Sequence, residues 1–220
     1  MVRILSAARD IGVRFGQGAT VLDLGTQEGV HGIEFAKKGA MVTTIEGRRA
    51  NWRKVEFASK AIGLENIKNI LDDITGLDFE NMEEFDFVIC SGILYHLPIE
   101  TQSALLDYLA TKSRIGFVVD SHFSFQNNSS FEFDGLTYYG RAESEFNEGA
   151  ERFEVESAVY KSLDTRPSFQ ISRASFVNFM SDRGVRSVYE LFTPIRSPSK
   201  ERALINRCCF VCVSGVKRET

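Results

Sequence analysis

Residues 20–38, TVLDLGTQEGVHGIEFAKK, decide the fold of this 220-residue chain. Residues 20–24 predict a buried strand, residues 25–29 a tight glycine turn, and residues 30–38 a helix with an apolar inner face. Such a turn is typical of a ligand site, because its glycines let backbone N–H groups approach a ligand and the helix N-terminus that follows favours an anion. Asp23, at the end of the strand, is expected either to hold the loop or to reach a cationic group.

The next predicted strand, residues 41–45, ends at Glu46. This acid follows the turn by about twenty residues, where a carboxylate suits the two neighbouring hydroxyls of a ribose. Both NAD and S-adenosylmethionine (SAM) carry such a ribose. The dinucleotide fingerprint G-x-G-x-x-G would need glycine where this chain has Gln27 and Val30. The remaining alternative is a glycine turn that only closes a strand–helix unit.

The turn itself, DLGTQEG at residues 23–29, resembles the D-x-G-x-G-x-G loop of class I SAM-dependent methyltransferases, with Gln27 in place of the middle glycine. A more specific resemblance lies in residues 85–97, FDFVICSGILYHL, which are similar to the F-D-x-V-x-x-x-x-V-L-Y-H-L segment of the same family. In order and spacing, the resemblance covers residues 20–120. It implies a Rossmann-like α/β fold with SAM as cofactor and S-adenosylhomocysteine as product.

The resemblance also implies where adenine would bind. Class I methyltransferases hold adenine with an acid that follows the third strand, predicted here at residues 66–71. By alignment of the strand end this acid is Asp73, with Asp72 as the second candidate and Ile74 packing on the purine. Either aspartate could instead cap a helix.

The segment after the fourth strand is expected to carry the methyl end of the cofactor. By resemblance, Ser91 and Gly92 flank the methionine part of SAM, while Tyr95 and His96 face the transferred methyl group. His31, at the start of the first helix after the turn, is expected to hydrogen-bond the SAM carboxylate or the loop. The full set expected to bind the cofactor is Asp23, Gly25, Thr26, Gln27, Gly29, His31, Glu46, Gly47, Asp73, Ile74, Ser91 and Gly92.

Amphipathic periodicity predicts further helices at residues 2–15, 50–62, 99–110 and 172–183. The helix at residues 2–15 is expected against the sheet edge or over the cofactor. Arg48 and Arg49 precede the second of these helices and are expected at a solvated helix start.

The last two strands distinguish this fold from a dehydrogenase. A fifth parallel strand is predicted at residues 114–119, and two more at residues 185–192 and 204–213. The connection at residues 193–199 is too short for a crossover helix, so the last two strands should pair antiparallel, whereas an ordinary Rossmann domain would continue with parallel strands. The predicted fold is therefore a Rossmann-like, seven-stranded, mostly parallel sheet with an antiparallel last strand and helices on both faces.

Residues 121–171 exceed what this fold needs. We therefore predict a single methyltransferase domain over residues 1–220, in which 121–171 form a lid or substrate-binding insertion. Residues 121–170 hold ten aromatic residues and nine acidic against four basic residues, a net charge of −5. This charge repels phosphate backbones, so a nucleic acid partner is disfavoured. A short segment, PSFQISRASF at residues 167–176, is nevertheless similar to a methyltransferase subgroup that includes wobble-uridine modifiers of transfer RNA.

Composition predicts a soluble, cytoplasmic protein. With 43% hydrophobic and 25% charged residues, the chain can bury one full core. It contains no apolar run of the roughly 18 residues that a membrane span needs and no signal-peptide core at its start. On a strand, Cys208 and Cys212 would lie on one face and Cys209 on the other, with no histidine nearby, so we expect reduced thiols and no metal site. The sequence leaves the oligomeric state open.

The predicted activity is methyl transfer from SAM, EC 2.1.1, with O-methylation of a small molecule or glycan-linked sugar as the first choice. An acidic, aromatic cover suits a sugar ring or a small amine-bearing molecule. His96 and His122 are the candidate bases for a hydroxyl proton. The open alternatives are N-methylation of a small amine, methylation of a tRNA wobble base, a non-catalytic SAM-binding protein, and an NAD-dependent oxidoreductase.

Overall fold

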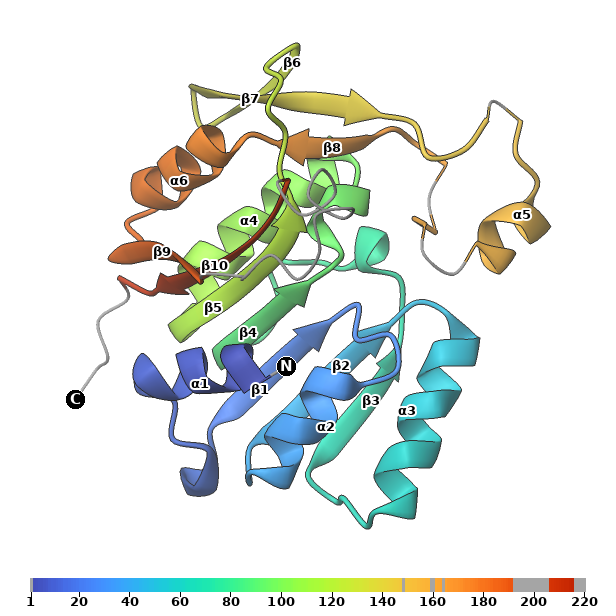
Figure 1. The fold of residues 1–220 in the computed structure, drawn as a ribbon, viewed down its shortest axis with the longest axis vertical. Coiled ribbons are helices and arrows are strands. Elements are labelled where there is room, and N and C mark those ends of the chain that lie inside the picture. The colour runs from blue at the N-terminus through green and yellow to red at the C-terminus, as the bar shows by residue number, and fades with distance from the viewer. Residues whose placement is uncertain (1, 148, 159–160, 164, 192–205, 216–220) are drawn as a thin grey trace, which may run out of the picture.

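A computed structural model describes residues 2–147, 149–158, 161–163, 165–191 and 206–215. Its centre is a seven-stranded sheet in the order β3-β2-β1-β4-β5-β10-β9 (Figure 1). The strands are β1 (Thr20–Leu24), β2 (Met41–Glu46), β3 (Ile67–Leu71), β4 (Phe85–Ser91), β5 (Ser113–His122), β9 (Ser187–Leu191) and β10 (Arg207–Val213). The first five are parallel, and β10 runs antiparallel to both neighbours. This confirms the predicted fold class.

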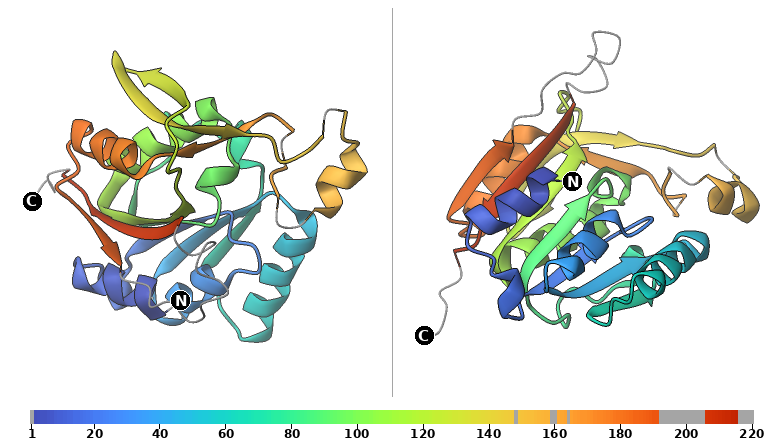
Figure 2. Two further views of the ribbon diagram at one scale, coloured as in Figure 1. Left: turned by 45° about the horizontal axis from the view of Figure 1, so that its top comes forward. Right: turned by 60° about the horizontal axis from the view of Figure 1, so that its bottom comes forward.

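Helices cover both faces of the sheet (Figure 2). They are α1 (Val2–Asp10), α2 (Val30–Lys37), α3 (Arg49–Ala61), α4 (Ile99–Lys112) and α6 (Arg173–Asp182), with short 3-10 turns η1 (Phe15–Gln17), η2 (Ile74–Gly76) and η3 (Leu94–His96). One apolar cluster joins α1 and α2 to the sheet, and a larger one joins α4 and α6 to its other face. Within the described ranges, no helix has the length and apolar character that crossing a membrane requires.

The N-terminal helix is shorter than predicted and lies elsewhere. It ends at Asp10, because Gly12 takes a left-handed conformation with φ +104° that breaks the helix before residue 15. Ile4, Ala7 and Ala8 pack against the face of the sheet at β5 and β10. The expected place at the sheet edge or over the cofactor is therefore wrong.

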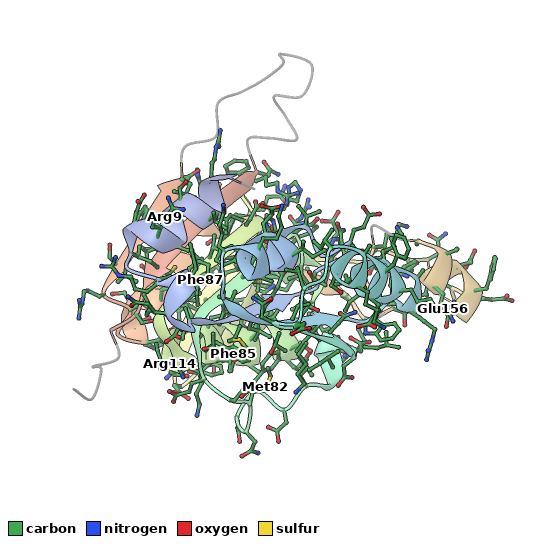
Figure 3. The ribbon with its side chains drawn as sticks, turned by 90° about the horizontal axis from the view of Figure 1, so that it is seen from below. Arg9, Met82, Phe85, Phe87, Arg114 and Glu156 are labelled. Atoms are coloured by element: carbon green, nitrogen blue, oxygen red, sulfur yellow. The ribbon has the colours of Figure 1, made fainter. Side chains whose placement is uncertain are left out.

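The insertion at residues 121–171 forms a second, three-stranded antiparallel sheet in the order β6-β7-β8. Its elements are β6 (Ser129–Phe133), β7 (Leu136–Glu143), α5 (Arg152–Ser157) and β8 (Ser168–Ile171). Tyr138, Phe169 and Ile171 are buried in the same cluster as α4 and α6, so these strands belong to the core. Residues 149–158, which carry α5, instead extend away from this sheet, and Glu156 of α5 lies on the opposite side of the molecule from Arg9 of α1 (Figure 3).

The C-terminal strands follow the predicted pattern of alternation. Cys208 and Cys212 are buried in the cluster with α4 and α6, whereas Cys209 packs against the cluster on the other face. All four cysteines are free thiols. The predicted connection at residues 193–199 lies outside the described residues.

Candidate functional site

A cavity of about 510 Å³ opens at the carboxyl ends of the parallel strands. This edge of an open α/β sheet is where ligands bind, and the volume lies in the range of roughly 300–1,000 Å³ typical of small-molecule sites. The cavity brings together every predicted site residue except Gly29 and His122. These lining residues are Asp23, Gly25, Thr26, Gln27, His31, Glu46, Gly47, Asp73, Ile74, Ser91, Gly92 and His96.

Asp23 holds the glycine loop. Its Oδ2 atom accepts hydrogen bonds from Thr26 Oγ1 at 2.6 Å and from the Gly32 N–H at 2.9 Å. Burial raises the pKa of Asp23 to about 6, and these two hydrogen bonds lower it in part. Two roles were expected for this carboxylate, holding the loop or reaching a cationic group, and the geometry shows that it holds the loop.

The loop glycines act through backbone conformation and close packing. Gly25 has φ +62°, and a Cβ atom there would lie 2.5 Å from Ile93 Cδ1. Gly29 caps α2 at φ +79° and faces Val55, which explains why it does not line the cavity. Gln27 occupies the middle-glycine position with φ +50°, so a non-glycine residue here takes a left-handed conformation.

Glu46 joins the loop to the second strand. Its Oε2 atom accepts the Gln27 N–H and its Oε1 atom the Arg48 N–H, both at 2.8 Å. Burial raises the pKa of Glu46, and the two backbone donors oppose this shift. Each carboxylate oxygen has two lone pairs, so the group can still accept from a diol in the cavity.

Asp73, rather than Asp72, lines the cavity. Its Oδ1 atom accepts the Thr75 N–H at 2.9 Å and so caps η2, while Ile74 beside it is buried. Asp72 instead accepts the Asp73 N–H at 2.8 Å. The two roles considered for an acid here are compatible, because a capping carboxylate has lone pairs left for a ligand.

Three aromatic rings pack together next to the glycine loop's cavity, and two of them, Tyr95 and His96, line it. The Tyr95 ring lies 4.0 Å from the His96 ring and 4.7 Å from the His122 ring, between centroids. His96 lines the cavity, and its Nδ1 atom lies 2.5 Å from Glu145 Oε1. His122 does not line the cavity, and burial lowers its pKa, as does the nearby Arg207 cation.

His31 lines the cavity at the start of α2. Its Nδ1 atom is buried and makes no hydrogen bond within the part of the chain that the structure describes. Burial lowers the pKa of His31, which favours the neutral ring. A neutral imidazole with a free nitrogen fits a polar group of a bound ligand.

The sequence reasoning missed an ion pair at the base of the cavity. Arg207 donates from Nε at 2.9 Å and from Nη2 at 3.0 Å to the Asp120 carboxylate, and both residues line the cavity. Asp120 also accepts from Ser91 Oγ at 3.3 Å. The pairing of β5 with β10 brings Arg207 and Asp120 together. No local motif predicts this ion pair, because the two residues are 87 positions apart in the sequence.

Arg48 differs from its prediction as a solvated residue. It is buried, and its guanidinium donates to the carbonyls of five insertion residues, Val155, Glu156, Ala158, Lys161 and Ser162, at 2.8–3.3 Å. A guanidinium has five N–H donors in a rigid plane, which suits a converging set of carbonyls. The insertion is thereby attached directly beside Glu46, and residues 161–163 become part of the cavity wall.

Comparisons with known proteins agree with this fold. Residues 21–114 match the family model of a methyltransferase domain. The comparison with curated proteins found no match. Among solved structures, the chain is similar to the N-terminal domain of EvdMO1 in the presence of S-adenosylhomocysteine and D-fucose, with a TM-score of 0.71 and 24% identity over 97% of this chain and 82% of that chain.

Two further structures share the fold at lower identity. Magnesium protoporphyrin IX methyltransferase (ChlM) from Synechocystis PCC 6803 with bound SAM has a TM-score of 0.57 and 16% identity, over 97% of this chain and 76% of that one. The Burkholderia thailandensis 1,6-didemethyltoxoflavin-N1-methyltransferase, with bound 1,6-didemethyltoxoflavin and S-adenosylhomocysteine, has a TM-score of 0.57 and 12% identity, over 97% and 78%.

Proposed function

We propose that this chain, a class I SAM-dependent methyltransferase, transfers the methyl group of SAM to a hydroxyl of a small molecule or a glycan-linked sugar. The observation that carries the proposal is a cavity that holds the glycine loop, Glu46 and Asp73 together with His96. The residues that we assign to the cofactor and a candidate base therefore line the same cavity.

The residues present fit SAM. We assign Glu46 to the ribose diol, Asp73 with Ile74 to the adenine, and the glycine loop to the methionine part. We assign His31 to the polar end of that part, because it lines the cavity directly after the glycine loop. When bound, SAM supplies a methyl group on a positively charged sulfur, which leaves as a thioether.

The protein's own task is to align the acceptor and to take up its proton. The acceptor oxygen forms a bond to the methyl carbon as the carbon–sulfur bond breaks, and the hydroxyl proton passes to a base. His96 is the preferred base, because it lines the cavity and its Nδ1 atom is already engaged, which leaves Nε2 for the acceptor. His122 is the second candidate. It does not line the cavity, but its ring contacts the ring of Tyr95, which does.

A sugar or small molecule is preferred as acceptor on two grounds. The crystal structure of the EvdMO1 domain was determined in the presence of S-adenosylhomocysteine and D-fucose, which supports a sugar. The insertion that borders the cavity is acidic and aromatic, which opposes binding of a polyanion such as RNA. The toxoflavin N1-methyltransferase favours N-methylation as the second candidate function.

The test is transfer from methyl-labelled SAM to small-molecule, glycan and RNA fractions of a cell extract. We expect label in the small-molecule or glycan fraction, followed by a loss of about 10²–10⁴-fold in turnover for His96→Ala with unchanged SAM affinity. If only His122→Ala slows transfer, His122 is the base. Label in the RNA fraction alone would favour a tRNA substrate, and no transfer to any fraction would favour a SAM-binding protein.

A further inference from the structure

We propose that Glu145 of the insertion is the positioning residue for His96, so that the insertion completes the catalytic centre in addition to covering it. This inference rests on the proposed function. Glu145 Oε1 lies 2.5 Å from His96 Nδ1, across 49 positions of sequence. Both side chains are largely withdrawn from solvent, with 17% of His96 and 15% of Glu145 exposed, so solvent screens this contact less than it would a surface ion pair.

Glu145 is itself held in place by its surroundings. Its second carboxylate oxygen accepts the Ser162 N–H at 2.8 Å, and its backbone carbonyl accepts from Lys161 Nζ at 2.7 Å. Arg48 in turn donates to the carbonyls of Lys161 and Ser162. The carboxylate therefore sits in a loop that is attached to the same strand end as Glu46.

This arrangement selects one tautomer of His96. An ionised carboxylate only accepts, so the hydrogen on the ring must lie on Nδ1, which leaves the lone pair of Nε2 free. During transfer the acceptor O–H bond breaks as an N–H bond forms at Nε2, while the C–O bond replaces the C–S bond. The imidazolium that results lies against the Glu145 carboxylate, which stabilises its charge in the way a third group orients and supports a histidine base.

The decisive variant is Glu145→Gln. The amide that replaces the carboxylate has one acceptor and one donor end. With its oxygen on the Ser162 N–H, its NH₂ group faces His96 Nδ1 and imposes the opposite tautomer, with hydrogen on Nε2. We expect turnover to fall by about 10²–10⁴-fold, while the SAM dissociation constant changes by less than about threefold. Glu132→Gln, which removes one charge from an exposed position of strand β6 in the same insertion, is the matched control.

A readout that needs no turnover is the nitrogen NMR spectrum of the neutral histidine rings. The chain has only three histidines, so single substitutions assign every signal. We expect hydrogen on Nδ1 of His96 in the wild-type protein and on Nε2 in Glu145→Gln. An unchanged tautomer in the folded variant would overturn the proposal, as would a wild-type spectrum with hydrogen on Nε2.

Two further variants separate positioning from folding. Glu145→Asp keeps the charge and should recover part of the turnover, and Glu145→Gln should cost little in a His96→Ala background, because the two residues act as one unit. Equal losses in both backgrounds would show a merely structural contact and overturn the proposal. If the wild-type protein methylates no fraction, the proposed function fails, whereas the tautomer measurement still decides whether Glu145 orients His96.

Discussion

Glu46→Gln tests the assignment of the cofactor site most directly. The Glu46 carboxylate accepts two backbone N–H groups, from Gln27 and Arg48, at 2.8 Å each. A glutamine has one accepting oxygen, so one of these two donors loses its partner, and the ribose diol loses a charged acceptor. A hydrogen bond to a charged group contributes about 1.5–3 kcal/mol, so we expect SAM binding to weaken by about 1–3 kcal/mol, or roughly five- to 150-fold.

The loss of SAM affinity expected for Glu46→Gln must be distinguished from an effect of damage to the glycine loop. Asp73→Asn serves this purpose, because asparagine caps a helix as well as aspartate does and keeps the Thr75 contact. Its neutral oxygen is a weaker acceptor for the adenine amine, and we expect a loss of about 1 kcal/mol in SAM binding without a change in thermal stability. Glu56→Gln, on the outer side of α3 where Glu56 pairs with Lys60, should leave binding unchanged.

The assay is isothermal titration calorimetry with SAM, supported by thermal unfolding of each variant. A dissociation constant that is unchanged in both Glu46→Gln and Asp73→Asn would refute the assignment of this cavity to SAM. A thermal-shift comparison of SAM, S-adenosylhomocysteine and NAD on the wild-type protein gives the complementary result. Stabilisation by NAD alone would favour an oxidoreductase.

Substitutions at three further positions, Asp23, Arg48 and Gln27, test how the site is held together. Because burial raises the pKa of folded Asp23 from 3.8 to about 6, the native protein retains a proton that the unfolded chain releases, and the free energy of unfolding should fall by roughly 2.4 kcal/mol as the pH rises from 4 to 7. Asp23→Asn should not show this fall. If chemical denaturation gave the same pH dependence of the free energy of unfolding for the wild-type protein and Asp23→Asn, the raised pKa of Asp23 would be contradicted. Arg48→Met should release residues 155–162 and increase proteolysis there, whereas Arg49→Met, at an exposed position, should not; equal cleavage would contradict the role of Arg48. Gln27→Gly should keep or raise the melting temperature, because glycine adopts φ +50° freely, whereas Gln27→Val should lose about 1–2 kcal/mol of stability; the reverse order would contradict strain at this turn.

The half of the cavity that we assign to the cofactor was predictable because its residues follow the ends of consecutive strands. Glu46 and Asp73 each end or follow a strand that the apolar pattern already indicates. The carboxyl ends of parallel strands meet at one edge, so local spacing alone places these acids around one cavity. The same reasoning could not tell that Glu46 and Asp73 also hold backbone N–H groups, since that depends on the exact path of each turn.

The N-terminal helix illustrates the limit of periodicity. Its apolar spacing is correct, and Ile4 and Ala8 are buried as the pattern requires. The pattern does not show that Gly12 breaks the helix or which surface covers its apolar side. Helix ends and docking surfaces depend on tertiary contacts, which local periodicity does not contain.

The sequence by itself determined the succession of strands and helices, the antiparallel end of the sheet and the acids that we assign to the cofactor, because each depends on residues in or next to a single strand. Only the tertiary structure decided the partners that come from far along the chain. Arg207 meets Asp120 across 87 positions, and Glu145 meets His96 across 49. Arg48 meets the insertion across more than 100. From sequence alone, charged side chains such as these are expected in solvent. Only the folded structure shows which of them are buried together as partners.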